Sequence, residues 1–416
     1  MHIIDELTWR GLIKDTSNRE ELASILSKPT TIYCGFDPSA TSMHLGNFVP
    51  ISVLMRLQRA GHRIIALVGG ATGMIGDPSG KSKERNLLDK TTLASNTALI
   101  QKQLTRFLDF SDPKKGVVLN NYDWLGKLSM IDYLRDFGKY FPINVMLAKD
   151  VVANRLENGL SYTEFSYMML QSIDFYHLYQ EEQCQIQFGG SDQWGNLTSG
   201  LELIRKATDK PVPAAVFTTP LITRSDGKKF GKSEDGALFL DAQLTSPYTL
   251  YQYFYNVSDA DAIRYLEIFS FLDQVSIRAI QVEHEQKLGQ RIGQKALAEQ
   301  LVTLIHGEEG LKEAQALTHV FFTGAFQTLS QPQLTAVFAD KMIQVDGTLP
   351  LEDILVSIGA ASSKREAREF IQGNSIQING KVMKELGQAL EHLPSLHGAY
   401  YVIRRGKKQY YCVTVK

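Results

Sequence analysis

His44 and Asn47 stand three residues apart where the sequence predicts the start of a helix. The apolar run 31–35 predicts a strand before them, and the spacing of apolar residues over 48–57 predicts the helix. The first turn of a helix presents free backbone N–H groups and the positive end of the helix dipole. With two side-chain donors on the same turn, this corner is a candidate anion site, most simply for a nucleotide phosphate. A structural corner with an incidental histidine would give the same pattern.

Tyr167, Gln171 and Asp174 form a second candidate constellation. Their spacing of four and three residues places them on one face of a predicted helix, beside methionine and leucine. Polar groups on one face with apolar neighbours fit the wall of a half-buried pocket. The alternative is an amphipathic helix whose polar face is solvated.

Two glycine-rich segments follow predicted strands. The apolar run 64–68 is typical of a buried parallel strand and leads into 69–80, and the short strand 184–188 leads into Gly189 and Gly190. A third strand is predicted at 116–121. Ligands of doubly wound sheets bind at the carboxyl ends of the strands, so both segments are candidate ligand-facing turns. The spacing does not fit a Walker loop.

Lys229 and Lys232 lie in a glycine- and lysine-rich stretch, 224–233, which has no apolar period and predicts an exposed loop. Lysines on such a loop can close on a phosphate chain and stabilise charge that develops there. A solvated basic loop is the alternative.

The composition limits the class of protein. A chain of 416 residues with 44% apolar and 21% charged residues predicts a globular protein of roughly two to three domains. We expect no membrane span and no signal peptide, because no apolar run is long enough and the N-terminus carries acidic residues. Three scattered cysteines predict neither a disulfide framework nor a metal site, and we expect a cytoplasmic location. A net charge of −1 gives no bulk signal for nucleic acid.

Taken together, these motifs resemble those of class I aminoacyl-tRNA synthetases. His44-Leu45-Gly46-Asn47 is similar to the HIGH signature, and Lys229-Phe230-Gly231-Lys232-Ser233 is similar to the KMSKS signature. The Tyr-x-x-x-Gln-x-x-Asp pattern and the intervening segments resemble the bacterial tyrosyl-tRNA synthetases along the whole chain. Asn47 departs from the final histidine of HIGH, and Phe230 and Gly231 depart from the Met and Ser of KMSKS.

The resemblance implies a role for each matched residue. Catalytic roles fall to His44, Asn47, Lys229 and Lys232. Tyrosine is expected to contact Tyr33, Asp77, Tyr167, Gln171, Asp174, Gln187 and Gln193. ATP is expected to contact Cys34, Asp37, Ser39, His44, Gly46, Asn47, Asp192, Lys229, Phe230, Gly231, Lys232 and Ser233. Contacts with tRNA are expected at Lys81, Lys83, Arg85, Lys364, Arg365 and Arg368.

The implied activity is that of a tyrosine–tRNA ligase. L-Tyrosine would react with ATP to give tyrosyl-adenylate and pyrophosphate, and the tyrosyl group would pass to the 3′ end of tRNA(Tyr). Mg²⁺ would be bound through the nucleotide phosphates, without a metal site on the protein. A homodimer is expected.

The expected fold class is α/β, with a Rossmann-like doubly wound parallel sheet in the catalytic domain. The expected segments are a catalytic domain at 1–220, a KMSKS-type loop region at 221–246, an α-helical anticodon-arm domain at 247–336, a linker at 337–350 and a small α+β RNA-binding domain at 351–416. The last segment is basic, with ten Lys and Arg against six Asp and Glu. It contains a predicted helix at 362–373 and a hairpin at 376–382 with an Asn-Gly turn.

Three alternatives remain open from the sequence. A tryptophanyl-tRNA synthetase shares the class and fold, although Asp174 with Tyr33 suits a phenol better. A small-molecule nucleotidyltransferase would leave the RNA-binding segments unexplained, and an RNA-binding protein that kept only the fold would not need both signatures. Pyrophosphate exchange dependent on the amino acid distinguishes all of these.

Overall fold

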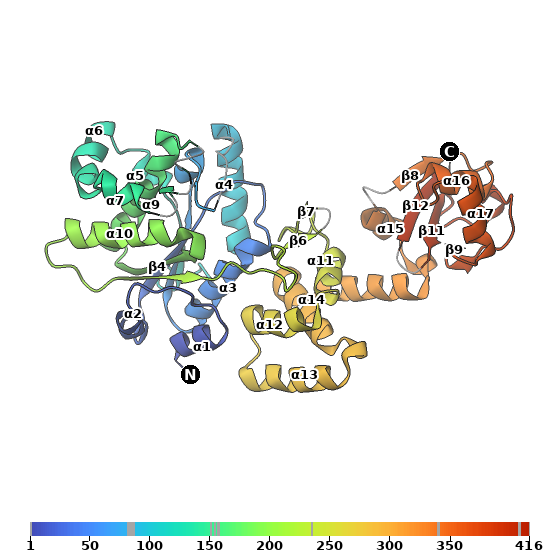
Figure 1. The fold of residues 1–416 in the computed structure, drawn as a ribbon, viewed down its shortest axis with the longest axis horizontal. Helices are drawn as coiled ribbons and strands as arrows, with labels where there is room; N and C mark the ends of the chain where they lie inside the picture. The colour runs from blue at the N-terminus through green and yellow to red at the C-terminus, as the bar shows by residue number, and fades with distance from the viewer. Residues whose placement is uncertain are drawn as a thin grey trace. The chain divides into compact units, whose positions relative to one another are not determined.

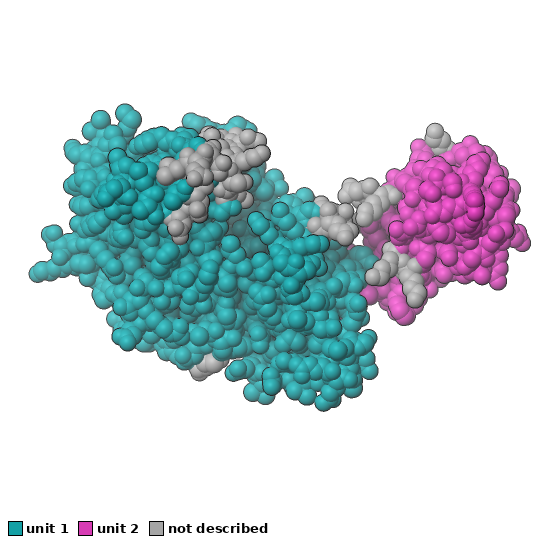
Figure 2. All heavy atoms as spheres, viewed as in Figure 1, with its two compact units in different colours: residues 1–308 teal, residues 309–416 magenta. Residues whose placement is uncertain are grey.

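The computed structural model describes residues 2–80, 88–149, 152–153, 155, 159–233, 236–338, 342–406 and 409–415. The chain forms two compact units, Met1–Glu308 and Glu309–Lys416 (Figures 1 and 2). In the described residues, no helix combines the length and the apolar character that a membrane crossing requires.

A five-stranded parallel sheet forms the centre of the first unit. Its strands are β1 (Thr31–Phe36), β2 (Arg63–Val68), β3 (Gly116–Asn120), β4 (Cys184–Gly190) and β5 (Ala215–Thr219), in the order β3-β2-β1-β4-β5. The strand order reverses between β1 and β4, so a crevice opens there at the carboxyl ends of the strands. This topology confirms the predicted doubly wound fold.

Helices cover both faces of this sheet (Figure 1). Helices α3 (Leu45–Arg59) and α4 (Lys90–Leu104) pack on one face, and α9 (Tyr162–Glu181) and α10 (Trp194–Ala207) pack against each other on the opposite face. Under α9 and α10 lies a buried apolar cluster that includes Tyr33, Ile65, Phe175, Leu201 and Val216. Burying each side chain of this size contributes about 1.5–3 kcal/mol of transfer free energy. This packing holds the strands in place, and with them the strand ends where the crevice opens.

The remaining elements of the first unit are mostly helical. They are α1 (Ile3–Trp9), α2 (Arg19–Leu26), α5 (Tyr122–Leu125), α6 (Met130–Asp132), α7 (Ile143–Leu147), the short pair β6 (Lys232–Ser233) and β7 (Gly236–Ala237), α11 (Pro247–Tyr255), α12 (Asp259–Phe269) and α13 (Gln274–Gln286). Helix α14 (Ile292–Thr323) contains Gly307 at a non-helical φ of 77°, next to the boundary between the units.

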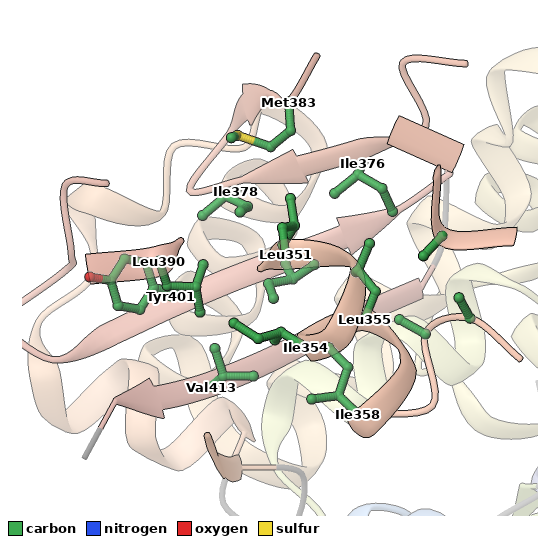
Figure 3. Packing of buried hydrophobic residues seen from close by; sticks show 14 of the residues in the cluster. Leu351, Ile354, Leu355, Ile358, Ile376, Ile378, Met383, Leu390, Tyr401 and Val413 are labelled. Carbon is green, nitrogen blue, oxygen red and sulfur yellow. The ribbon is translucent and has the colours of Figure 1, made fainter. Parts of the chain in front are cut away.

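The second unit is built on a mixed sheet in the order β10-β9-β11-β12-β8. Its elements are α15 (Gln331–Phe338), β8 (Met342–Val345), α16 (Leu351–Ser357), α17 (Lys364–Gln372), β9 (Ile376–Ile378), β10 (Lys381–Val382), β11 (Tyr400–Arg405) and β12 (Gln409–Val415). Figure 3 shows its core, in which α16 lays Leu351, Ile354 and Leu355 over the sheet. Asn379 and Gly380 both have positive φ, 49° and 84°, which confirms the predicted Asn-Gly hairpin turn.

The two compact units are a coarser division of the chain than the expected segments. Residues 247–308, the greater part of the expected helical domain, belong to the first unit. The expected linker, 337–350, contains β8, which pairs with β12 in parallel. A parallel edge strand of four residues gives almost no periodic signal, which is why composition alone suggested a linker there.

Candidate active site

A cleft of about 560 Å³ opens at the carboxyl ends of the strands, where their order reverses. Every residue expected to contact tyrosine or ATP lines it except Ser233. That serine belongs to β6, and its side chain lies outside the described part of the structure. The cleft therefore brings together residues that are separated by up to two hundred positions in the chain.

Asp174 lines the cleft and is buried, with 3% of its surface exposed. Its two oxygens accept hydrogen bonds from Trp124 Nε1 at 2.8 Å and Asn121 Nδ2 at 2.9 Å. Burial raises the pKa of Asp174 to about 7, although both hydrogen bonds favour the charged form. The indole N–H of Trp124 thus holds the carboxylate together with Asn121, and no sequence motif pointed to either residue.

Tyr33 presents an unpaired hydroxyl group beside this carboxylate. The residue is 1% exposed, and its hydroxyl has no hydrogen-bond partner in the part of the chain that the structure describes. Burial, and then the charge of Asp174, raise the pKa of Tyr33 well above its ordinary value, so the phenol stays neutral. Gln187 Oε1 is also buried without a described partner. An unpaired buried polar group costs about 1–3 kcal/mol, so these groups favour a ligand that offers both a donor and an acceptor.

Asp37 is held by Tyr167 and Thr72. The hydroxyl of Tyr167 donates to Asp37 Oδ2 and that of Thr72 donates to Asp37 Oδ1, both at 2.8 Å. Thr72 also accepts from Asn121 Nδ2 at 3.0 Å, so a hydrogen-bonded chain joins Asp37 to Asp174. Gly69 leaves room for this carboxylate, since a Cβ there would lie 1.9 Å from Asp37 Oδ1.

Asn196, on α10, lies among three amide and hydroxyl oxygens. Its Nδ2 is 3.1 Å from Gln171 Oε1, 3.1 Å from Gln193 Oε1 and 3.2 Å from Ser79 Oγ. Gln193 in turn donates to Asp77 Oδ2 at 2.7 Å. The residue is 1% exposed. Asn196 thus orients two of the glutamines that the sequence singled out, although no local pattern marks it as a site residue.

Four carboxylates line the cleft, namely Asp37, Asp77, Asp174 and Asp192. Amides and hydroxyls donate to the first three. Lys229 and Lys232, which come from the loop, line the same cleft. A cleft with both carboxylates and lysines suits a ligand that carries an ammonium group and phosphates.

His44 caps α3. Its Nδ1 accepts from the backbone N–H of Asn47 at 3.3 Å, and Asn47 Oδ1 accepts from the backbone N–H of His44 at 3.1 Å, which makes a reciprocal capping box. Because Nδ1 is an acceptor, the ring proton of the neutral imidazole lies on Nε2. Gly46 leaves space for the ring, since a Cβ there would approach His44 Cε1 to 2.8 Å.

The lysine-bearing loop contacts the start of α3. Gly231 has a φ of 75°, and a Cβ on it would lie 2.8 Å from Leu45 Cβ. Leu238 donates its N–H to Gly231 O, and its own carbonyl accepts from Leu45 N, both at 2.9 Å. Lys229 and Lys232 are exposed, as expected. Phe230 is not, because its ring is buried among aromatic side chains of α11 and α12, which corrects the expectation of an exposed loop throughout.

The expected tRNA contacts fall into two groups. Lys81, Lys83 and Arg85 lie outside the described residues. Lys364, Arg365 and Arg368 lie on α17 and are more than half exposed, and each pairs with an acid of the second unit, namely Asp353, Glu369 and Glu352. An exposed ion pair contributes about 0–1 kcal/mol, which describes Arg365 with Glu369, whereas Glu352 is buried.

Comparison with known proteins places this geometry in a family. The sequence model described as tRNA synthetases class I (W and Y) matches residues 26–323. The model described as the tyrosine–tRNA ligase SYY-like C-terminal domain matches residues 335–413. The chain belongs to the tyrosyl-tRNA synthetases of class I.

Curated relatives match this chain over its full length. A tyrosine–tRNA ligase from Bacillus caldotenax is 48% identical and covers 99% of both chains. Tyrosine–tRNA ligase 1 from Bacillus subtilis strain 168 is 46% identical over the whole of both chains. The crystal structure of a C-terminally truncated mitochondrial tyrosyl-tRNA synthetase from Aspergillus nidulans matches with a TM-score of 0.70 and 32% identity, covering 77% of this chain and 94% of that one. The resemblance inferred from the sequence motifs is thereby confirmed, and the three alternatives fall away.

Replacing Trp124 with phenylalanine is expected to move the pH dependence of tyrosine activation upward. The indole N–H stabilises the charged form of Asp174, so its loss raises a pKa that burial has already brought to about 7. If the carboxylate accepts from the substrate, kcat/KM for tyrosine rises with pH through this pKa, and in Trp124→Phe it rises at higher pH. Pyrophosphate exchange measured from about pH 6 to 9 reports the midpoint. An unmoved midpoint would mean that Trp124 does not tune the carboxylate.

Proposed function

We propose that the residues of this cleft activate L-tyrosine with ATP and then transfer the tyrosyl group to tRNA(Tyr). The observation that carries the proposal is the unpaired hydroxyl of Tyr33 beside the buried carboxylate of Asp174, in the same cleft as both signature elements. A phenol can donate to Asp174 and accept from Tyr33. Phenylalanine can do neither and would leave both groups unsatisfied.

The tyrosine ammonium group is assigned to the side of the cleft that carries Asp77, Tyr167 and Gln171. Gln193 donates to Asp77 at 2.7 Å and Asn196 donates to Gln171 at 3.1 Å, and these bonds fix the directions of the two acceptors. Tyr167 is held separately by its bond to Asp37. Gln187 borders the same recess with an unpaired oxygen. We retain Asp37 as a residue of the nucleotide side of the cleft, but its bonds to Tyr167 and Thr72 support an additional role in holding the tyrosine pocket.

The ATP phosphates are assigned to His44 and Asn47 on α3 and to Lys229 and Lys232 on the loop. No side chain needs to act as a nucleophile, because the tyrosine carboxylate attacks the α-phosphorus and pyrophosphate leaves. Donors fixed around the developing charge lower the barrier. Cys34, Ser39 and Asp192 line the same cleft and are assigned to the nucleotide, with backbone contacts from Gly46 and from the loop residues Phe230, Gly231 and Ser233.

Mg²⁺ is proposed to enter with the nucleotide. Within the described residues, no group of three histidine, cysteine or acidic side chains is placed to hold a metal ion. Bound to the phosphate oxygens, the ion would neutralise charge on the leaving pyrophosphate. We also propose a cytoplasmic location, supported by three free cysteines, all buried.

The two-step function is tested by following adenylate formation and transfer separately in one rapid-quench experiment. Wild-type protein with tyrosine and ATP is expected to form one adenylate per active site and to release AMP when tRNA(Tyr) is added. Charge reversal at Arg365, which is 90% exposed on its side chain, is expected to weaken charging and spare the adenylate. Adenylate that does not transfer would contradict the second step. Charging by the Arg365 variant at the wild-type rate would mean that α17 does not contact the tRNA.

A homodimer is proposed through the region of α6, α7 and the start of α9. Met130, Ile131, Ile143 and Tyr162 are 63–73% exposed there, an apolar surface that an isolated chain would leave in water. Sedimentation equilibrium is expected to give twice the chain mass of 46.6 kDa. Ile143→Asp is expected to give monomers, whereas Val275→Asp, at an equally exposed position on α13, is expected to stay dimeric. A wild-type monomer, or an Ile143→Asp dimer, would contradict the proposal.

A further inference from the structure

Helix α12 contacts the loop that carries Lys229 and Lys232. Near the start of the helix, the Asp261 carboxylate is 2% exposed and accepts from the backbone N–H of Ser225, at 3.0 Å to each oxygen, and from Ser225 Oγ at 2.9 Å. Ser225 opens the turn in which Arg224 N donates to Lys228 O. A carboxylate of the helix thus holds the loop at its first turn.

A second contact holds the loop five residues later. The Phe230 ring is 7% exposed, stacks on Phe269 at 4.8 Å and meets Tyr265 edge-on at 4.9 Å. Both partners belong to α12. Residues 226–229 therefore lie between two anchors on one helix, and Lys232 follows just after the second.

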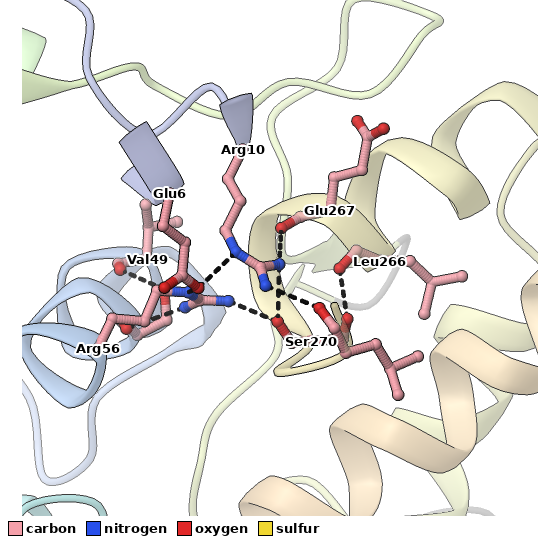
Figure 4. Close-up of polar contacts among 9 residues, drawn as sticks. Glu6, Arg10, Val49, Arg56, Leu266, Glu267 and Ser270 are labelled. Carbon is pink, nitrogen blue, oxygen red and sulfur yellow. Dashed lines mark hydrogen bonds and ion pairs between the residues drawn. The ribbon is translucent and has the colours of Figure 1, made fainter. Parts of the chain in front are cut away.

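The other end of α12 is tied to α3, the helix that His44 caps. Arg56 of α3 donates to Ser270 O at 2.6 Å and to Ser52 O at 2.9 Å (Figure 4). Arg10 donates to the carbonyls of Glu267, Ser270 and Leu272 at 2.7–3.1 Å. Figure 4 shows both guanidinium groups converging on the Ser270 carbonyl at the C-terminal end of the helix, where its dipole favours cations.

These contacts leave α3 and α12 little freedom to shift against each other. The side chains of Arg10 and Arg56 are 3% and 1% exposed, and one half-buried acid, Glu6, pairs with both. Buried cations of this kind are tolerated only where fixed carbonyl oxygens surround them. A displacement of α12 would therefore leave the guanidinium groups of Arg10 and Arg56 buried without acceptors. Phe48 of α3 adds a stacked contact with Phe269 at 6.0 Å.

We propose that α12 positions the two ATP-binding elements relative to each other, with Asp261 as the positioning residue for the lysine-bearing loop. The inference rests on the proposed function of that loop and of His44. Asp261 touches neither substrate in this account. It acts through Ser225 by setting where the loop begins, and Phe230 sets where it ends.

The test is Asp261→Ala in the full chain, followed by single-turnover adenylate formation. We expect the activation rate per active site to fall roughly 10- to 100-fold through misplaced lysines, while the tyrosine dissociation constant changes less than about 2-fold. Asp261→Asn keeps one acceptor for the Ser225 N–H and is expected to recover part of the rate. The double variant Asp261→Ala with Phe230→Leu is expected to lose less activation rate than the product of the two single fold-losses, because both changes release the same loop.

Asp273→Ala is the matched control. Asp273 caps α13 by accepting from Ser276 N at 2.7 Å, so its loss removes a helix cap nearby without touching the loop. Its activation rate is expected to match wild type. If Asp261→Ala lowers the melting temperature as this control does but leaves the rate unchanged, the inference is overturned.

Ser225→Ala covers the case in which Asp261→Ala does not fold. Ser225 is exposed, and the change removes its hydroxyl bond to Asp261 and the 2.9 Å contact between Ser225 Oγ and Ser258 Oγ. The bond from the Ser225 backbone N–H to Asp261 remains. A smaller rate loss in the same direction is expected, and a wild-type rate would overturn the inference. A wild-type protein that forms no adenylate would instead contradict the proposed function, so the two failures are distinguishable.

Discussion

Asp174→Ala is expected to lower kcat/KM for tyrosine by roughly 10²- to 10⁴-fold, which corresponds to about 3–5 kcal/mol. Removing one partner from a buried, charged hydrogen bond costs a free energy of this size. Asp174 is the carboxylate at the recess, and Asn121 and Trp124 hold both of its oxygens in place. In the proposed function, the tyrosine hydroxyl is the third donor to this carboxylate. Without the carboxylate, that hydroxyl is buried beside Tyr33 with no acceptor of comparable strength.

The ratio of tyrosine to phenylalanine gives this prediction an internal control. Phenylalanine makes no hydrogen bond to Asp174, so its kcat/KM is expected to change far less than that of tyrosine. The measurement is amino-acid-dependent pyrophosphate exchange with both substrates over a range of concentrations. An equal fall for both would indicate damage to the fold and would contradict a specific role in recognising the phenol.

Replacing His44 with alanine is expected to slow adenylate formation by roughly 10²- to 10³-fold, the usual cost of removing one fixed donor from developing charge. The capping box places the ring proton on Nε2, away from the helix backbone. From this position at the first turn of α3, it can donate to a phosphate oxygen together with the helix dipole. Tyrosine binding is expected to be nearly unchanged, because His44 lies on the nucleotide side.

His44→Ser separates the two roles of this residue. Serine is a strong N-cap, so it restores the bond to the Asn47 N–H that alanine loses, worth about 1 kcal/mol of stability. We expect His44→Ser to melt close to wild type and yet to form adenylate as slowly as His44→Ala. Activation that recovers with the cap would mean that His44 serves the helix and not the phosphate.

The sequence predicted which residues belong to the site better than it predicted the hydrogen bonds between them. His44 and Asn47 could be placed on one helical turn because that spacing is local. Their reciprocal capping bonds could not be foreseen, since a histidine is an unusual N-cap. Tyr167 and Asp174 were found from helical spacing, but the partners of Asp174 come from the end of β3, some fifty residues away. No local pattern joins Asn121 or Trp124 to that carboxylate.

The loop at 224–233 shows why composition misled in one place. Glycine and lysine correctly predicted exposed side chains at Lys229 and Lys232. The single aromatic residue between them, Phe230, was read as part of a nucleotide-binding signature, whereas its ring packs on α12. An isolated apolar residue in a basic loop was the available signal for such an anchor. The role of Arg10 could not be predicted either, because its partners are backbone carbonyls more than 250 residues away in the chain.

The most direct test of the account is ATP–pyrophosphate exchange by the wild-type protein with each standard amino acid in turn. The recess of Tyr33 and Asp174 predicts exchange with tyrosine and none with phenylalanine or tryptophan above background. Exchange with tryptophan at a comparable rate would mean that the carboxylate does not select a phenol. Exchange with no amino acid at all would contradict the assignment of the cleft to tyrosine activation.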